Sequence, residues 1–405
     1  MQKNNYADLT AISIISILPI LFMAGSGVIN ISVILLDLIL LYKLLKKREI
    51  SYLNNKYFYS LLSIWAILLI SLIFSNYLYD SMYRAIGFIR FIFFVFAIRY
   101  FFTLNKEEFK NTILNAWTIF LLVITFDLIY EYIFGVNILG FVSPMHGRLV
   151  SFLGDELKIG GLYFGILGLG LANLYIYIST KKNTYFYKDN FFYIMVILFL
   201  VTAYLIGERS NFVKILLLLV FFIIFRERER LLKKFLIIIG GFIIIIFITS
   251  SNDLLKYRFW TTFLKPVIND PIHIIGNTQY GYLYKGGLNM FNNNKLFGVG
   301  LKNFRNEIGK DKVYMNAGSN HPHQFHIEIL AELGVMGYLS FFIFFVFNLY
   351  FSIKYFLRNK DLIQLSAMLF VFCSLIPLLP SGSFFSTFGA SIFWLNFALM
   401  LPKHN

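Results

Sequence analysis

The sequence predicts an all-α polytopic membrane protein with about twelve transmembrane helices. Hydrophobic residues make up 58% of the 405 residues, and charged residues only 14%. Ordinary soluble domains carry about 25% charged residues. Apolar runs of about 20 residues, enough to cross a bilayer as a helix, recur from end to end. The first run has no small-residue cleavage site after it, so we interpret it as a span rather than a signal peptide.

The predicted spans divide the chain into four consecutive parts. Spans one to five occupy residues 1–134, and spans six to nine occupy 135–250. One long periplasmic loop, 251–334, separates the ninth and tenth spans, and the last three spans lie in 335–405. The individual predicted spans are 8–25, 27–45, 57–75, 83–101, 112–134, 159–179, 190–207, 210–226, 233–250, 335–357, 362–380 and 384–401.

The orientation follows from the basic connectors between spans. Lys and Arg residues cluster in five connectors that fall on alternate turns, whereas the opposite connectors, such as "AGSG", are short and nearly uncharged. Because basic loops remain in the cytoplasm, these five connectors and both termini are predicted to be cytoplasmic. The basic connectors are 43–49, 104–110, 180–190, 226–234 and 357–361.

The long outer loop is predicted to carry function, because loops of this length inside a compact protein usually do. From Ser251 to His323 it holds nine Lys and Arg residues against four Asp and Glu residues. This excess indicates an anionic ligand, although a solvated surface with scattered lysines explains it equally well. Most of the formal charge of +15 is attributed to the basic connectors that set the membrane orientation, so no nucleic-acid partner is expected.

Three of the six histidines gather at the end of this loop, in "HPHQFHIEILAELGVMG". His321, His323 and His326 have a spacing that resembles metal-ligand spacing, but Cys is absent nearby and carboxylates are sparse. A second interpretation is that the histidines are structural polar residues at the end of a membrane-spanning helix. We favour a third, in which at least one imidazole acts as a general base, since neutral imidazole accepts protons near neutral pH.

The residues after the histidines predict a short helix that starts near residue 323 and is broken by Gly334 and Gly337, before the tenth span. Glu328 and Glu332 lie four residues apart and therefore share one face of this helix. Glu328 is a candidate to orient a histidine, whereas we interpret Glu332 as part of a solvated face.

Two arginines near the outer side are candidates for binding anions. Arg209 lies in the tight outer turn "GERSN", where an arginine is costly unless it lines a polar cavity. Its planar fork suits phosphate oxygens, although snorkelling to lipid head groups is an alternative. Arg258 shortly follows the ninth span and is a second candidate or an interfacial anchor. Glu208 is expected to pair with a basic residue.

Several chemistries are not supported by the sequence. The turn "FGVGLKNF" has too few glycines for a P-loop, and no Gly-Lys-Ser/Thr follows it. No G-x-S-x-G, H-E-x-x-H or C-x-x-C motif occurs. We therefore expect no ATP hydrolysis and no cofactor.

Two of these motifs together resemble the C-terminal signature of the O-antigen ligase and O-antigen polymerase superfamily. "KLFGVGLKNF" is similar to the family pattern P-x-x-G-x-G-x-x-x-F, and "HPHQFHIEILAELGVMG" is similar to H-N-x-x-L-x-x-x-x-E-x-G-x-x-G. Gln324 stands where the family has asparagine, and Asn294-Lys295 stands where proline is common. The resemblance covers the middle and C-terminal two-thirds of the chain and includes "GRLVSFLGDELKIGG".

The resemblance implies metal-independent glycosyl transfer at the periplasmic face of the bacterial inner membrane. The implied partners are membrane lipid, a glycan donor on undecaprenyl diphosphate, and a hydroxyl of a glycan or lipid A–core acceptor. His323 matches the family's histidine and would be catalytic, supported by His321 and Glu328. Arg209 would also be catalytic and would bind the diphosphate together with Arg258. A polymerase of the same superfamily is the nearest alternative, and a lipid-linked glycan flippase or another transporter is the second.

Overall fold

The computed structural model describes residues 6–103, 107–154, 156–180, 185–226, 231–270, 278–310 and 319–403. These residues form helices and connecting loops without a strand, which confirms the predicted all-α class. Eight of the described helices are long and apolar enough to cross a membrane, and three more apolar helices are shorter. A helix lies over each of the twelve predicted spans, but the number of membrane crossings stays a prediction.

The chain divides into two compact units, each assembled from three separate segments. The first unit comprises Met1–Val28, Phe101–Pro266 and Phe356–Ser374. The second unit comprises Ile29–Tyr100, Val267–Tyr355 and Leu375–Asn405. The units are interleaved along the sequence, so they differ from the four consecutive parts predicted from hydropathy.

The first unit is organised around α7 (Ile159–Thr180), which packs against α6, α8, α9 and α17. Two of its glycines allow this approach. A Cβ at Gly168 would lie 3.3–3.4 Å from Ser366 and Leu218, and one at Gly170 would lie 2.7 Å from Leu121. The other elements of this unit are α1 (Tyr6–Met23), α6 (Glu107–Phe134), η3 (Ser151–Leu153), α8 (Tyr185–Leu205), α9 (Arg209–Arg226), α10 (Leu231–Ser251), α11 (Asp253–Leu255), η4 (Lys256–Leu264) and α17 (Leu362–Ser374). The division between the units falls within α12 (Lys265–Asn269), after Pro266.

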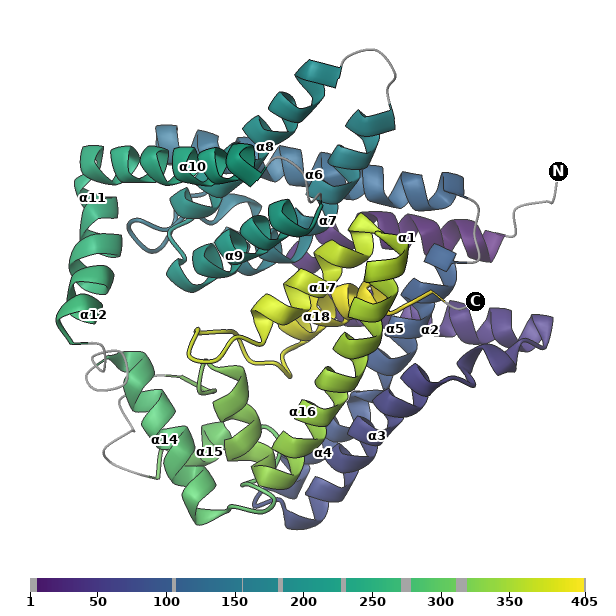
Figure 1. The fold of residues 1–405 in the computed structure, drawn as a ribbon. Helices are drawn as coiled ribbons and strands as arrows, with labels where there is room; N and C mark the ends of the chain where they lie inside the picture. The colour runs from purple at the N-terminus through teal and green to yellow at the C-terminus, as the bar shows by residue number, and fades with distance from the viewer. Residues whose placement is uncertain are drawn as a thin grey trace. The chain divides into compact units, whose positions relative to one another are not determined.

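The second unit is built along α16 (Phe325–Asn359), the long helix that runs beside α3 (Lys56–Ser71) in Figure 1. Asn348 of α16 donates a hydrogen bond to Ser60 of α3, and the rings of Phe351 and Tyr57 meet edge to face. The other elements are α2 (Ser26–Lys47), η1 (Ile50–Leu53), η2 (Leu72–Phe74), α4 (Leu78–Gly87), α5 (Ile89–Thr103), α14 (Gln279–Asn293), α15 (Phe304–Ile308) and α18 (Thr387–Met400).

α16 is kinked at Gly334, whose φ of 63° and ψ of −164° are not helical. The kink frees backbone groups, and the "KLFGVG" segment binds them. Two carbonyls of α16 accept hydrogen bonds from this segment, and two amides of α16 donate to it. The four hydrogen bonds are Val299 N–H to Ala331 O (2.9 Å), Gly300 N–H to Glu332 O (2.9 Å), Val335 N–H to Lys295 O (2.8 Å) and Met336 N–H to Leu296 O (3.2 Å).

The kink explains why glycines occur in both motifs. A Cβ at Gly334 would lie 2.5 Å from the carbonyl carbon and oxygen of Leu296. A Cβ at Gly298 would lie 2.5 Å from the backbone nitrogen of Leu333, and Gly298 has a φ of 67°. Each glycine is therefore required by close backbone approach and by left-handed backbone conformation. The two motifs, separate in the sequence, are one structural element.

Two sequence predictions can be compared with the structure here. A helix begins at Phe325 and its helical geometry is interrupted at Gly334, which confirms the predicted short helix and glycine break before the tenth span. The segment 251–334 is not simply a loop, because it contains α11, η4, α12, α14 and α15. Parts of this segment (271–277 and 311–318) and of three basic connectors (104–106, 181–184 and 227–230) lie outside the described residues.

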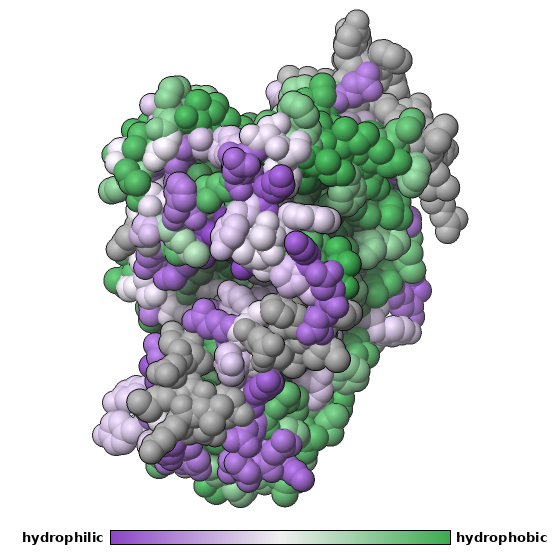
Figure 2. All heavy atoms as spheres, turned by 90° about the vertical axis from the view of Figure 1, so that its left-hand side faces the viewer, coloured by the Kyte–Doolittle hydropathy of each residue, from purple (hydrophilic) through white to green (hydrophobic). Residues whose placement is uncertain are grey.

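Large apolar side chains are exposed on many of the helices, among them Ile31, Phe126, Phe247 and Ile343, each at least 61% exposed. Figure 2 shows broad hydrophobic areas beside separate areas where hydrophilic residues gather. Exposed apolar surface of this extent is unfavourable in water and favourable in hydrocarbon. The chain is a multi-pass membrane protein.

Candidate functional site

In the first unit, Arg258 joins two loops that are distant in sequence. It lies on η4, a π-helical segment, and donates hydrogen bonds to His146 O (3.3 Å) and Gly207 O (2.9 Å). The loops touch where Gly207, with a φ of 77°, faces the carbonyl oxygen of Gly147 so closely that no Cβ fits. π-Helical turns are often found at functional sites, and this one brings Arg258 to the outer turn predicted to carry function.

Arg209 is the first residue of α9 and is half-buried. Its Nη1 atom donates a hydrogen bond of 3.4 Å to Thr262 Oγ1, and its guanidinium carbon lies 5.5 Å from the Phe263 ring centroid. Both partners lie close to Arg258 in the sequence, on or beside the same π-helical segment. The structure therefore brings the two predicted arginines to one region of the first unit.

Glu208 forms an ion pair with Arg148 and a hydrogen bond with Asn211. This confirms the expectation that Glu208 pairs with a basic residue. Arg148 also donates to Leu157 O at 3.0 Å. Arg148 is a third arginine of this region, and the sequence analysis did not single it out although it lies within the quoted segment "GRLVSFLGDELKIGG".

Two carboxylates of α6 hold the loop that carries Arg148. Asp127 accepts hydrogen bonds from the Ile138 amide (2.9 Å) and from the Ser151 hydroxyl (2.5 Å). Glu131 accepts from the amides of Val150 (3.0 Å) and Ser151 (2.7 Å). Ser151 has a φ of 50°, a strained backbone that these hydrogen bonds maintain.

In the second unit, His323 lies between two aromatic neighbours. Its ring centroid is 3.9 Å from that of His321 and 5.4 Å from that of Tyr280. Its backbone has a φ of 55°, and its carbonyl accepts a hydrogen bond of 2.7 Å from the Ser381 amide. A non-glycine residue in this region costs free energy that the surrounding contacts must offset, as often happens at functional sites.

Both imidazoles favour the neutral form. Burial lowers the pKa of His323, and a hydrogen bond with the Ser381 backbone opposes part of that change. The pKa of His321 falls to about 3, first because of burial and then because of the positive charges of His323, Lys302 and Arg305. A neutral imidazole at neutral pH is competent to accept a proton.

The residues that follow begin α16 and do not contact the His323 ring in any described interaction. The Gln324 side chain accepts a hydrogen bond of 2.8 Å from the Ile327 amide. This hydrogen bond pairs a backbone amide in the first turn of α16. The two ring nitrogens of His326 lie 3.2 Å from the Tyr338 hydroxyl and 2.7 Å from Leu375 O. His326 is therefore held by structural contacts.

A buried polar network lies beneath the histidines. Glu328 accepts hydrogen bonds from the Ser383 hydroxyl (2.5 Å) and the Phe384 amide (2.8 Å). Lys302 donates from Nζ to Ser383 Oγ at 3.0 Å, and its own amide donates to Glu332 at 2.8 Å. The side chains of Glu328 and Glu332 are fully buried. A buried carboxylate persists only where such partners surround it.

Two predictions about these glutamates have different outcomes. Glu332 does not lie on a solvated face, so that interpretation is wrong. The reason is tertiary, because the "KLFGVG" segment covers this side of α16 and places Lys302 on the carboxylate. Glu328 makes no described contact with a histidine ring, and instead anchors the loop around Ser383, whose neighbour Ser381 binds His323.

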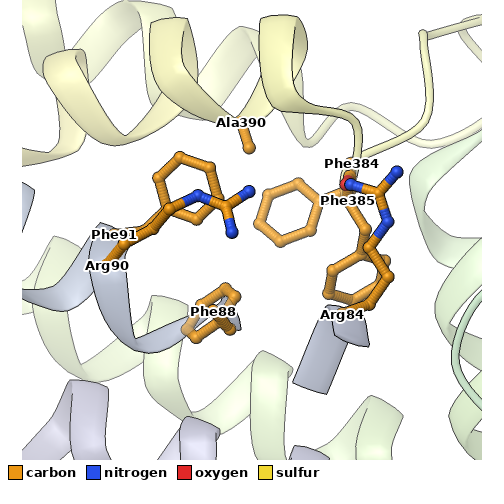
Figure 3. Close-up of a pocket in the computed structure, with 7 residues that line it drawn as sticks. All are labelled: Arg84, Phe88, Arg90, Phe91, Phe384, Phe385 and Ala390. Carbon is orange, nitrogen blue, oxygen red and sulfur yellow. The ribbon is translucent and has the colours of Figure 1, made fainter. Parts of the chain in front are cut away.

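A small pocket in the second unit is lined by arginines and aromatic rings within predicted spans. Arg90 reaches toward the centre of this group and Arg84 lies on the opposite side (Figure 3). Arg90 donates a hydrogen bond of 2.8 Å to Gly87 O, and Arg84 one of 3.2 Å to Phe385 O. Intramembrane arginines commonly mark functional regions. The lining residues are Arg84, Phe88, Arg90, Phe91, Phe384, Phe385 and Ala390.

The predicted site residues fall into two groups. Arg209 and Arg258 lie in the first unit, and His321, His323 and Glu328 lie in the second. The structure adds Arg148 to the first group and Lys302 to the second. Among the described residues, no three His, Cys, Asp or Glu side chains are arranged to hold a metal ion.

Comparison with known families shows which family the region that holds these two groups of residues resembles. The model of the O-antigen ligase family matches residues 194–342. Residues 194–342 are therefore similar to the O-antigen ligase family. This matched region contains all five predicted site residues, together with Lys302, the "KLFGVG" segment and the kink of α16. Arg148 and Arg84 lie outside the O-antigen ligase match. No curated protein matches the chain.

Proposed function

We propose that the chain transfers a glycan from an undecaprenyl-diphosphate carrier to a sugar hydroxyl at the periplasmic face of the bacterial inner membrane. The match to the O-antigen ligase family supports a role in making surface polysaccharide. The single observation that carries the proposal is that the matched region contains a half-buried histidine, His323, whose pKa is lowered by burial, together with Arg209 and Arg258. A glycosyl transfer onto a hydroxyl needs a base, and a diphosphate leaving group needs cations.

In the proposed reaction, a ring nitrogen of His323 takes the proton of the acceptor hydroxyl. The acceptor oxygen then forms a bond to the anomeric carbon of the donor sugar, and the bond from that carbon to the diphosphate oxygen breaks. The lipid diphosphate leaves with the electron pair. General-base catalysis of this kind contributes about 10²–10⁴-fold in rate.

Arg209 and Arg258 are proposed to bind the diphosphate. Guanidinium groups match phosphate oxygens with paired N–H donors and offset the negative charge that develops on the leaving group. Arg258 is held by two backbone carbonyls and Arg209 by Thr262. Such preorganised donors stabilise charge without reorganising during the reaction.

The histidine is tested with membranes that contain the protein, a lipid-linked glycan donor and a lipid A–core acceptor. We expect His323→Ala to lower the initial rate of transfer at least about 100-fold. His146→Ala is the matched control, because its side chain is exposed and only its backbone carbonyl contacts Arg258. It should keep near-normal activity. Full transfer by His323→Ala would exclude the proposed base, and a flippase would tolerate this loss.

The same assay distinguishes ligase from polymerase and tests Arg209. Glycan attached to lipid A–core indicates the ligase, whereas chain growth on the lipid carrier indicates the polymerase. Arg209→Ala should raise the KM for donor more than Arg209→Lys, which keeps the positive charge. Equal losses in both variants would mean that the paired guanidinium contact, and not charge alone, holds the donor.

A further inference from the structure

Three consecutive residues, 147–149, contact the outer turn that precedes α9. One contact is an ion pair, one is a backbone hydrogen bond of 3.1 Å, and one is a close approach of two glycines. These contacts join Arg148 to Glu208, the Leu149 amide to Ile206 O, and Gly147 O to Gly207. Arg209, one of the two proposed diphosphate ligands, directly follows this turn. The segment 147–149 therefore borders the first turn of α9.

The same segment borders Arg258, the second proposed ligand. The Arg258 guanidinium donates hydrogen bonds to His146 O, the carbonyl just before the segment, and to Gly207 O in the turn. Its stem passes over Gly147, where an added Cβ would lie 2.8 Å from Arg258 Cδ and 3.1 Å from Leu254 Cδ2. Gly147 also has a φ of 78°. Glycine allows this close approach, and a larger residue would have to move the Arg258 side chain.

Arg148 binds protein groups in an enclosed setting. It donates to Leu157 O at 3.0 Å in addition to its ion pair with Glu208. Only 18% of the Arg148 side chain and 11% of the Glu208 side chain are exposed. The Glu208 carboxylate lies at the start of α7, where a Cβ at Gly160 would be 2.5 Å from Oε2. An enclosed ion pair cannot lose one partner without leaving the other charge uncompensated, so Arg148 fixes the position of Glu208, the residue before Arg209.

The segment 147–149 has an anchor of its own in α6. The two residues that follow it, Val150 and Ser151, donate hydrogen bonds from their amides to Glu131 at 3.0 and 2.7 Å. The Ser151 hydroxyl donates to Asp127 of the same helix. Both carboxylates are buried and belong to a helix of 28 residues. A segment that is anchored in this way can set the position of an arginine that packs on it.

We propose that Gly147 and Arg148 are positioning residues of the proposed diphosphate site. Gly147 sets the place of the Arg258 guanidinium, and Arg148, through Glu208, sets the first turn of α9 that carries Arg209. Neither positioning residue contacts the substrate. Donors that are fixed before binding stabilise an anion without reorganising, so a shift of either ligand should weaken binding. This role rests on the proposed function, which assigns the diphosphate to Arg209 and Arg258.

A matched pair of glycine variants tests the contact with Arg258. Gly147 and Gly140 have φ values of 78° and 84°, so alanine is strained at both positions. A Cβ at Gly140 has no atom within 4 Å, whereas one at Gly147 meets Arg258. With the purified full-length protein in detergent, we expect Gly147→Ala to weaken the Kd for inorganic diphosphate about tenfold. The Kd of Gly140→Ala should stay within about twofold of the wild type.

Arg148→Ala tests the ion pair with Glu208. It should weaken the Kd for diphosphate about tenfold, and Arg148→Lys should fall between this variant and the wild type because lysine keeps the positive charge. Lys158→Ala is the matched control, since it removes an exposed positive charge that is paired with Glu156 at 2.8 Å. Its Kd should stay within about twofold of the wild type. The Tm of each variant is measured in parallel, and a residue with only a structural role would lower the Tm without changing the Kd.

Transfer kinetics separate positioning from a loss of folded protein. Gly147→Ala and Arg148→Ala should raise the KM for donor and leave the KM for acceptor unchanged. A variant that is only less stable would lower kcat through loss of active protein and leave both KM values unchanged.

The binding data decide each role separately. The role of Gly147 is overturned if Gly147→Ala binds diphosphate as well as Gly140→Ala, and that of Arg148 if Arg148→Ala binds it as well as Lys158→Ala. Both roles are overturned if the wild type does not bind diphosphate. If Gly147→Ala does not fold, Arg148→Lys against Lys158→Ala decides whether the segment 147–149 positions the ligands. If no lipid-linked donor supports transfer by the wild type, the proposed function fails while the binding comparison still decides the positioning roles.

Discussion

At the scale of single residues, His321 and His323 show how neighbouring imidazoles acquire different environments. Their rings are 3.9 Å apart. His323 is held through the Ser381 backbone, whereas His321 borders Lys302 and Arg305. The chemistry available to each ring is thus set by residues far away in the sequence. This difference supports assigning the proposed proton-accepting role to His323.

The low pKa of His321 predicts a dependence of stability on pH. The pKa of His321 is about 3 in the folded protein, against an ordinary value of 6.5. Between these values the unfolded chain binds more protons than the folded one, so stability should rise with pH across this window and level off above it. His321→Asn should flatten the rise of Tm between about pH 4 and 6.5.

Thermal unfolding of detergent-solubilised protein at several pH values measures this slope. The charged and titratable groups that face His321 are His323, Lys302 and Arg305. His146→Asn, at an exposed position, is the control and should keep the wild-type slope. An unchanged slope in His321→Asn would show that another group causes the acid sensitivity.

At the scale of elements, the kink of α16 and the "KLFGVG" segment form one structural element. The segment replaces the hydrogen bonds that the helix loses at Gly334. This arrangement puts Lys302 against Glu332 and fixes the start of α16 beside His323. A helix that continued straight through residue 334 would need the segment to move away, because the same backbone groups would be paired within the helix.

Gly334→Ala tests whether the packing of the "KLFGVG" segment against the kink of α16 stabilises the protein. The substitution adds a Cβ that meets the Leu296 carbonyl at 2.5 Å and places alanine at a φ of 63°. We expect it to destabilise the protein by about 2–3 kcal/mol and to lower the Tm by about 5 °C. Thermal unfolding in detergent provides the measurement.

Gly309→Ala is the control for Gly334→Ala. It lies in the same unit, has no atom within 4 Å of the added Cβ, and has an ordinary φ of −74°. This substitution should leave the Tm unchanged or raise it slightly. Equal stability of the two variants would show that the contact between the "KLFGVG" segment and the kink of α16 does not contribute to stability.

At the scale of the whole molecule, the apolar helices and the connectors between them define how the chain crosses a membrane. Eight described helices are long and apolar enough to span. The charge pattern predicts that both termini and the connector 43–49 are cytoplasmic, whereas the segment 251–334 is periplasmic. These assignments come from sequence and are testable in cells.

Cysteine labelling tests the orientation, because the sequence contains a single cysteine, Cys373, which is buried. In a Cys373→Ala background, a new cysteine at the exposed position Lys295 should react with a membrane-impermeant maleimide in intact spheroplasts. One at the exposed position Lys46 should react only after the membrane is opened. Labelling of Lys46→Cys from outside would reverse the predicted orientation.

The sequence by itself determined the membrane class, the helices over the predicted spans, the glycine break at 334 and the similarity of residues 194–342 to the O-antigen ligase family. These depend on hydropathy, on local backbone preferences and on motif spacing, all of which are properties of short stretches of chain. Only the tertiary structure decided that Glu332 is buried against Lys302 and that Arg148 pairs with Glu208. It also showed that Gly207 packs on Gly147. Such contacts join residues that are tens of positions apart, and no local pattern encodes which charged group will meet which.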